Sequence, residues 1–166
     1  MSNLFWRITA KVLAKPAIAQ YLIERAKKTP YSPIVKDGDV YMDRFWLLNP
    51  YETCDGQQMG SRYPWFPWNV RIHHIRRPDQ DRHLHDHPWN ARTIILKGYY
   101  DEQRLDGCVI RKRGDTARLN FGEYHRIITV SAGGTWTLFI SGPYQGTWGF
   151  LVDGVKVRWR TYLDLD

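Results

Sequence analysis

The sequence predicts a mainly β protein, a small antiparallel β-barrel preceded by an N-terminal amphipathic helix. From residue 40 onward, short runs of β-branched and aromatic residues recur, separated by Gly, Pro, Asn and Asp. No helical pattern stands between these runs, which argues against the alternating strands and helices of a parallel sheet. Hydrophobic residues make up 43% of the chain and charged residues 25%, and a chain of 166 residues can enclose the core of one domain.

Apolar residues recur at helical spacing over residues 3–28, with Leu4, Ile8 and Val12 on one stripe. The helix is expected to start again at Pro16, because proline suits a first helical turn. We therefore divide the chain into a helical arm over residues 1–33 and a barrel domain over residues 34–166. The arm is expected to lie across the barrel or at a subunit interface; its basic amphipathic pattern leaves attachment to a membrane surface as the alternative.

Ten strands are expected in the barrel domain. They cover residues 40–48, 68–76, 83–87, 92–100, 108–112, 117–119, 125–131, 135–141, 148–152 and 155–159. The long aromatic segment over residues 49–67 is expected to be a loop, either a lid over the barrel mouth or an oligomer contact.

The charge of the chain is concentrated at its N-terminus. Residues 1–30 hold six basic side chains and one acidic side chain, which leaves the rest of a net charge of +7 nearly balanced. We expect no nucleic acid partner, because no broad basic face follows from this distribution. No apolar run approaches the roughly 20 residues of a membrane span, and no secretion signal is visible. Cys54 and Cys108 are expected to be free thiols, which indicates a cytoplasmic protein.

Three histidines alternate in the segment from His83 through His85 to His87. On a strand, alternating side chains point to one face, so these imidazoles could reach one ion. Neutral imidazole is a ligand for iron, zinc, nickel and similar ions. Asp86, between two of the histidines, should point away and serve a structural hydrogen bond.

This segment resembles the first cupin motif, in which two histidines separated by one residue precede a glutamate and, after six intervening residues, a glycine. Here the histidines are His85 and His87, Ala91 stands at the glutamate position, and Gly98 is the glycine. The second cupin motif places two glycines before a third histidine. Gly114, Gly122 and His125 follow at those separations, although Asn120 and Thr129 replace the motif's proline and asparagine.

The resemblance implies a cupin jelly roll, covering about residues 83–129 by its motifs. The His-Pro-Trp of residues 87–89 and several later aromatic positions are similar to uncharacterised cupin proteins of bacteria and phages. The resemblance to the cupin motifs further implies a metal site of His85, His87 and His125. It also suggests a homodimer, since cupins often pair through their sheets.

Ala91 cannot bind a metal, so the usual glutamate ligand is missing. A site of three bare histidines leaves about three open positions on an octahedral ion and is similar to that of the thiol dioxygenases. Alternatively a carboxylate joins from elsewhere, and Asp101, Glu102 and Glu123 are the candidates, of which we expect Glu102. A site that binds no metal is the third alternative.

Further residues are expected near the reaction. His83 has the parity to join the site as an acid or base, Arg92 follows the vacant glutamate position, and Tyr100 could supply a phenol. Five arginines surround the histidines in sequence, and one that points inward could clamp a carboxylate or phosphate bidentately. They are Arg71, Arg76, Arg77, Arg82 and Arg92. His73 and His74 lie on opposite faces of one strand, so at most one of them points inward. His74 is a remote candidate for a ligand, and neither histidine is expected to bind the metal.

The sequence therefore favours a metal-dependent cupin enzyme that uses iron(II) and dioxygen to oxidise a small anionic substrate. Zinc, nickel or manganese would suit the same ligands and would indicate a redox-neutral isomerase, lyase or hydrolase. A third possibility is a non-catalytic barrel that binds a ligand or a protein partner.

Overall fold

A computed structural model describes residues 3–36, 38–54 and 57–165, without the side chains of residues 53, 54 and 57–59. The helices are α1 (Asn3–Leu13), α2 (Pro16–Lys27) and α3 (Trp159–Tyr162). The first strands are β1 (Pro30–Lys36), β2 (Asp39–Leu48), β3 (Tyr51–Cys54), β4 (Gln57–Ser61), β5 (Asn69–Ile75) and β6 (Trp89–Lys97). The remaining strands are β7 (Tyr99–Arg104), β8 (Gly107–Lys112), β9 (Thr116–Leu119), β10 (His125–Val130), β11 (Thr135–Tyr144), β12 (Gly149–Val152) and β13 (Val155–Arg158).

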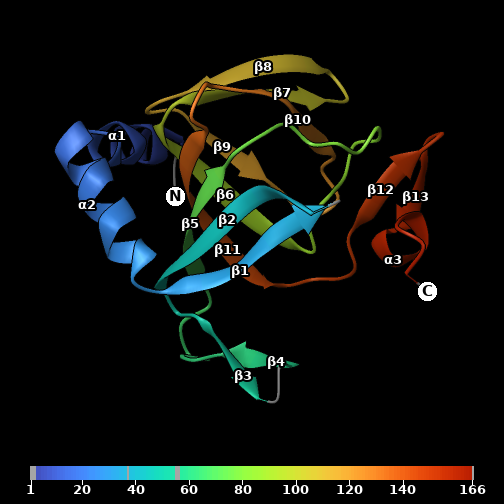
Figure 1. The fold of residues 1–166 in the computed structure, drawn as a ribbon, viewed down its shortest axis with the longest axis horizontal. Helices are drawn as coiled ribbons and strands as arrows, with labels where there is room; N and C mark the ends of the chain where they lie inside the picture. The colour runs from blue at the N-terminus through green and yellow to red at the C-terminus, as the bar shows by residue number, and fades with distance from the viewer. Residues whose placement is uncertain (1–2, 37, 55–56, 166) are drawn as a thin grey trace.

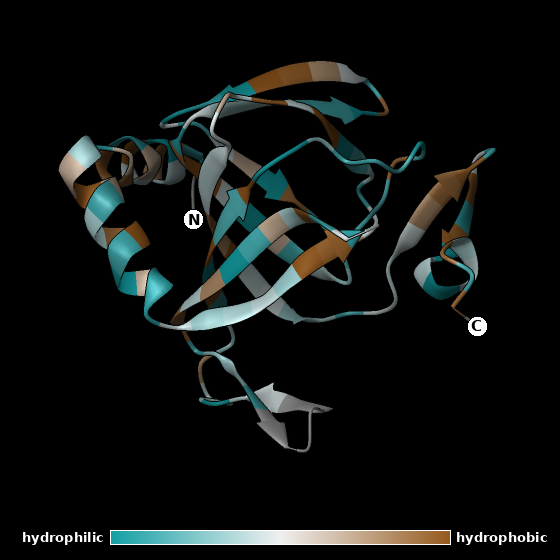
Figure 2. Ribbon diagram, in the orientation of Figure 1, coloured by the Kyte–Doolittle hydropathy of each residue, from teal (hydrophilic) through white to brown (hydrophobic). Residues whose placement is uncertain are grey.

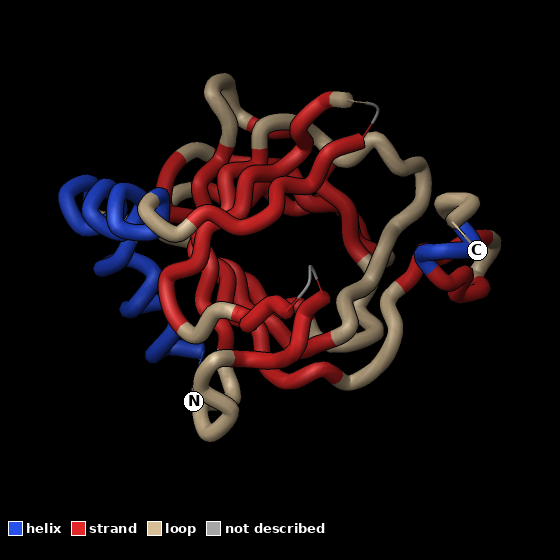
Figure 3. Tube along the Cα trace, turned by 60° about the horizontal axis from the view of Figure 1, so that its bottom comes forward, coloured by secondary structure: helices blue, strands red, loops and turns tan. Residues whose placement is uncertain are grey.

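The strands form a large sheet and several smaller ones, all with antiparallel pairing. The large sheet has the order β1-β2-β5-β11-β6-β9, and a three-stranded sheet has the order β10-β7-β8. The pairs β12-β13 and β3-β4 complete the fold. Figure 3 shows the strands arranged around a common centre. The mainly β prediction is confirmed, but the paired strands of the described chain do not close into one continuous barrel.

The two N-terminal helices cover the outer face of the large sheet (Figure 1). Small and branched residues of α2, among them Ala19 and Ile23, pack against Ile72, Ile94 and Leu138 of the central strands. Because side chains alternate along a strand, this contact assigns the neighbouring residues of those strands to the opposite, inner face. The helices therefore decide which face of each strand lines the interior.

One face of α1 stays exposed. Leu4, Phe5, Ile8 and Val12 all exceed 40% exposure, and Figure 2 shows apolar colour on this helix. The predicted apolar stripe is therefore not buried against the sheet. No helix in the described chain is long and apolar enough to span a membrane.

The structure differs from the predicted elements in several places, and neither β7 nor α3 was predicted as a separate element. Residues 83–87 form no strand and pair only at His85, through isolated bridges. Residues 30–36, where no strand was predicted and which the expected domain boundary after residue 33 divides, form β1. Its two prolines are tolerated because the strand lies at a sheet edge. The expected loop over residues 49–67 includes the hairpin β3-β4, which projects from the body of the molecule.

Gly98 makes the tight turn between β6 and β7 and shows why the motif has a glycine there. Its φ is +81°, and an added Cβ would lie 2.5 Å from Ser131 Oγ and 2.8 Å from the Gly134 carbonyl oxygen. We expect Gly98→Ala to lower the free energy of unfolding by about 2 kcal/mol or more, from strain and overlap together. Urea denaturation would measure the change.

Gly133→Ala is the matched control for that substitution. Gly133 has a similar φ of +78°, but a Cβ there would meet nothing within 4 Å. It should cost only the backbone strain, about 1 kcal/mol. Equal losses in the two variants would contradict the overlap at Gly98.

Candidate metal centre

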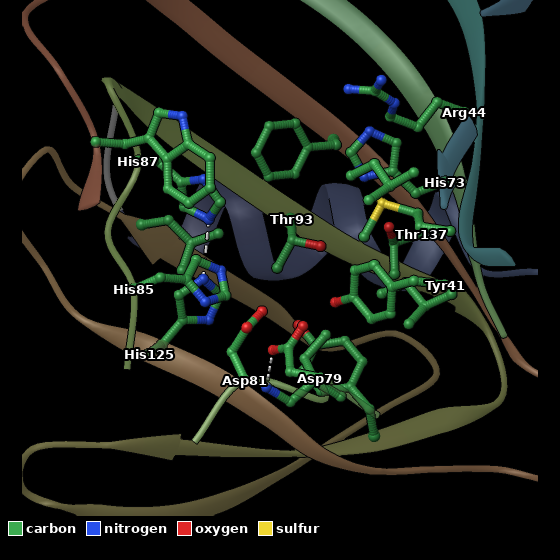
Figure 4. A pocket seen from close by; sticks show the side chains of 18 of the residues that line it. Tyr41, Arg44, His73, Asp79, Asp81, His85, His87, Thr93, His125 and Thr137 are labelled. Carbon is green, nitrogen blue, oxygen red and sulfur yellow. Dashed lines mark hydrogen bonds between the residues drawn. The ribbon is translucent and has the colours of Figure 1, made fainter. Parts of the chain in front are cut away.

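Three histidine side chains converge in the interior. The ligand nitrogens of His85, His87 and His125 all lie within 4.8 Å of one another. Nε2 of His87 lies 2.9 Å from Nε2 of His125. The three rings line one wall of a central cavity of about 290 Å³, as Figure 4 shows.

Backbone pairing brings the first and third histidines together although they lie far apart in sequence. The amide of His85 donates to the carbonyl of His125, and the amide of His125 donates to the carbonyl of His85, both at 2.9 Å. His85 is also bridged to Phe150 on its other side. His85 is therefore positioned by pairing with two neighbouring chain segments, and not by the regular strand that the sequence predicted.

Asp86 anchors the same segment from the opposite side. The side chain is fully buried, and its Oδ1 accepts a hydrogen bond of 2.7 Å from the amide of Gly149. Its Oδ2 accepts a hydrogen bond of 2.5 Å from Nζ of Lys156. As predicted, Asp86 points away from the histidines and serves a structural role.

The electrostatics of the cavity keep the imidazoles of His85 and His87 neutral. Burial, followed by the proximity of His125, lowers the pKa of His85 to about 4. Burial, His125 and His85 likewise hold the pKa of His87 well below its usual value. At neutral pH both rings therefore present a lone pair, which is the form that binds a metal.

The residues fit a metal ion. Two nitrogens that bind one octahedral ion at neighbouring positions, each at about 2.1 Å, lie about 3.0 Å apart. The observed 2.9 Å between His87 and His125 matches that separation. None of the described carboxylates belongs to this converging group, so the donor set is three imidazole nitrogens.

Glu102, expected as an additional ligand, lies behind His125 instead. Its Oε1 is 3.0 Å from Nδ1 of His125, the ring nitrogen that faces away from His87. The same carboxylate contacts Nη2 of Arg104 at 2.9 Å and Nε of Arg111 at 2.8 Å. Burial alone would raise the pKa of Glu102, but His125 and the two guanidiniums outweigh it and lower the pKa to about 2. Glu102 is thus placed to orient His125 rather than to complete the ligand set.

Two of the predicted reaction residues lie outside the cavity. Nδ1 of His83 is 2.9 Å from the hydroxyl of Tyr162 in α3, because the chain around His83 is not a regular strand. Arg92 lies over the ring of Trp6 in α1, with Cζ 4.7 Å from the ring centroid, and donates to Thr116. Its position in β6 belongs to the helix-facing side of the sheet, which is why it cannot reach the histidines.

Tyr100 does line the cavity, as expected. Burial and the neighbouring Glu102 raise the pKa of its phenol well above the usual value. The phenol therefore keeps its proton at neutral pH and can donate a hydrogen bond into the cavity.

Two residues whose orientation the sequence left undecided face inward. His73, not His74, points inward and stacks on Phe139 at 4.8 Å between centroids. Arg71, two positions earlier in β5, shares that face. The sequence showed that Arg71 and His73, two positions apart on one strand, share a face. It contained no signal for which face of β5 is the inner one.

Comparisons with known proteins support the fold. No protein-family model and no curated protein sequence matches the chain. Among solved structures, a cupin-2 domain from Rhodospirillum rubrum is similar with a TM-score of 0.53 at 11% identity, covering 74% of each chain. A cupin-superfamily sugar phosphate isomerase from Silicibacter pomeroyi has a TM-score of 0.49 at 12% identity, covering 68% of this chain and 66% of its own. The first of these two structures is a cupin domain, so the comparison supports a cupin fold, and at 11% identity the likeness concerns the fold alone.

Proposed function

We propose that the chain is a metal-dependent enzyme that oxidises a small anionic substrate with dioxygen. One observation carries the proposal: three imidazoles, two of them held neutral by burial, converge in one interior cavity, and the nitrogens of His87 and His125 have the spacing of two ligands to one ion. The ion that suits this function is iron(II), which when bound would supply a Lewis acid with open positions for substrate and dioxygen.

The residues around the histidines suit a reaction that must exclude bulk water. The cavity wall includes the apolar side chains of Ile75, Ile127, Phe139 and Phe150. Tyr100 lines the cavity, and we expect its protonated phenol to donate a hydrogen bond to a bound substrate. Oε1 of Glu102 lies 3.0 Å from Nδ1 of His125, and we expect this contact to orient the other ring nitrogen toward the cavity.

The test is elemental analysis of protein purified without a chelator or a polyhistidine tag. Near-stoichiometric iron that is absent from the His85→Ala, His125→Ala double variant would support the proposal. Oxygen uptake with small thiols and acids would then identify the substrate. Stoichiometric zinc, nickel or manganese would overturn the oxidation and favour a redox-neutral isomerase, lyase or hydrolase. No metal in either protein, even after reconstitution, would overturn the proposal of a metal-dependent enzyme. A non-catalytic barrel that binds a ligand or a protein partner would then be the better account.

We also propose that the protein is a cytoplasmic homodimer that pairs through α1. The exposed stripe of Leu4, Ile8 and Val12 supports an apolar contact with a second copy, and Cys108 is exposed and free, as in a reducing compartment. We expect Ile8→Glu to convert a dimer into a monomer in light scattering, while Lys15→Glu leaves the dimer intact. A wild-type protein that is monomeric at high concentration would contradict this assembly.

A further inference from the structure

A second chemical feature of the cavity is a buried positive charge without a counter-charge. Arg71 is 3% exposed, and its Nη2 donates a hydrogen bond of 2.9 Å to Ser141 Oγ, a neutral acceptor. Its Nε is buried and has no hydrogen-bond partner among the described residues. None of the described carboxylates lies within ion-pair distance of this guanidinium. A buried charge without an ionic partner is costly, so such a group indicates a ligand that supplies the missing charge.

The surroundings of Arg71 compensate its charge only in part. Cζ lies 5.3 Å from the ring centroids of Trp46, Trp89 and Phe139. Cation–π contacts of this kind are favourable, but they leave the in-plane N–H groups of the guanidinium unused. Those groups are the ones that bind a carboxylate or phosphate bidentately.

A second guanidinium lies on the same wall. Arg44 of β2 pairs in register with His73, while Arg71 of β5 pairs with Trp46, so both arginines belong to the inner face. Arg44 donates to the Ser32 carbonyl and lies over the ring of Tyr31, and it forms no ion pair with any described residue. Both arginines line the central cavity and also a second cleft of about 560 Å³. Two like charges on one wall repel each other, and a bound anion would offset that repulsion.

This positive wall and the three histidines belong to one cavity. Figure 4 shows Arg44 and His73 across the cavity from His85, His87 and His125. Trp89 and Phe139 connect the two sides: each ring centroid is 6.2 Å from that of His87 and 5.3 Å from Cζ of Arg71. A cavity of about 290 Å³ holds roughly ten water volumes of about 30 Å³ each, so its ligand is small.

We propose that Arg71, assisted by Arg44, is the receptor for the oxyanion of a small substrate whose other end carries a donor group toward the three histidines. The oxyanion is a carboxylate or a phosphate, since both accept two parallel N–H donors from one guanidinium. This inference rests on the proposed function and names the substrate class of its site. Arg71 would fix the orientation of the substrate.

The experiment is a titration followed by tryptophan fluorescence, because Trp46 and Trp89 contact Arg71. The probes are acetate, glycolate and inorganic phosphate, with ethylene glycol as the neutral counterpart of glycolate. We expect acetate or phosphate to bind wild type, and Arg71→Gln to weaken that binding about tenfold to a hundredfold. The stronger of the two anions identifies the oxyanion. On metal-loaded protein, glycolate should bind more tightly than acetate, while ethylene glycol should not bind.

Arg76→Gln is the matched control. Arg76 follows the same strand, but its Nε contacts Asp43 at 2.7 Å on the outside of the molecule. It should bind the anions as wild type does. Anion binding that is equal in wild type and Arg71→Gln would overturn the proposal, as would binding that Arg76→Gln weakens equally.

A stability measurement separates a receptor from a structural arginine. Since Arg71 has no ionic partner to lose, we expect Arg71→Met to melt at or above the temperature of the wild type in anion-free buffer. A marked loss of stability in that variant would show that Arg71 has a structural role in the core, and would overturn its proposed role as the receptor for an oxyanion. The metal content of Arg71→Gln is expected to equal that of wild type. Arg71-dependent anion binding in a protein that takes up no metal would refute the proposed function alone, whereas bound metal without such anion binding would refute this inference alone.

Discussion

Replacing Glu102 with glutamine is expected to lower the free energy of unfolding by about 3 kcal/mol and the metal affinity by about tenfold to a hundredfold. The substitution keeps the shape of a fully buried side chain but removes the charge that Arg104 and Arg111 contact. It also weakens the contact at 3.0 Å that holds Nδ1 of His125. Urea denaturation measures the first effect, and competition with a chelator of known affinity measures the second.

Glu123→Gln is the control for this variant. Glu123 also contacts Arg104, at 3.4 Å, but its side chain is 41% exposed and it does not contact a histidine. We expect it to change stability by less than about 1 kcal/mol and to leave metal affinity unchanged. Equal effects of the two substitutions would mean that the charge of Arg104, and not the support of His125, is what matters.

The same carboxylate predicts a dependence of stability on pH. The pKa of Glu102 is lowered from 4.5 to about 2 in the folded protein, so its contribution is present above pH 4.5 and is lost as the pH falls toward 2. The stability difference between wild type and Glu102→Gln should therefore be largest at neutral pH and shrink over this range. A difference that stays constant down to about pH 2.5 would contradict the assignment.

Replacing Asp86 with alanine is expected to destabilise the fold by about 3–5 kcal/mol. The substitution leaves the amide of Gly149 without its acceptor and Lys156 without its ionic partner, and both interactions end on a carboxylate with no exposed surface. Because Asp86 lies between two of the three histidines, metal affinity should fall as well, by about tenfold or more. Thermal and urea denaturation, with metal titration of the folded fraction, would measure both.

Lys156→Met separates the two contributions of Asp86. The lysine side chain is 31% exposed, so its replacement removes the ion pair but keeps the hydrogen bond to Gly149. A smaller loss than that of Asp86→Ala, with metal binding retained, is expected. If Lys156→Met matched the alanine variant in both measurements, the anchoring role of the Gly149 hydrogen bond would be wrong.

Local sequence patterns determined most of the secondary structure. The helical stripe over residues 3–28 and the restart at Pro16 appear as α1 and α2, because apolar periodicity and a proline first turn depend on neighbouring residues alone. Most predicted strands appear close to their expected bounds for the same reason. The spacing of His85, His87 and His125 with the motif glycines was likewise sufficient to identify the three side chains that the structure brings together.

Only the tertiary structure decided which other residues face the cavity. Alternation along a strand tells which side chains share a face, but the packing of α1 and α2 determines which face is the outer one. That packing places Arg92 outside and Arg71 inside, although both are arginines next to apolar strand residues. Glu102 lies behind His125 because β7 pairs with β10, a contact between segments that are distant in sequence. The sequence by itself thus determined the elements and the histidine group, whereas the long-range packing of helices and sheets determined the charges around it.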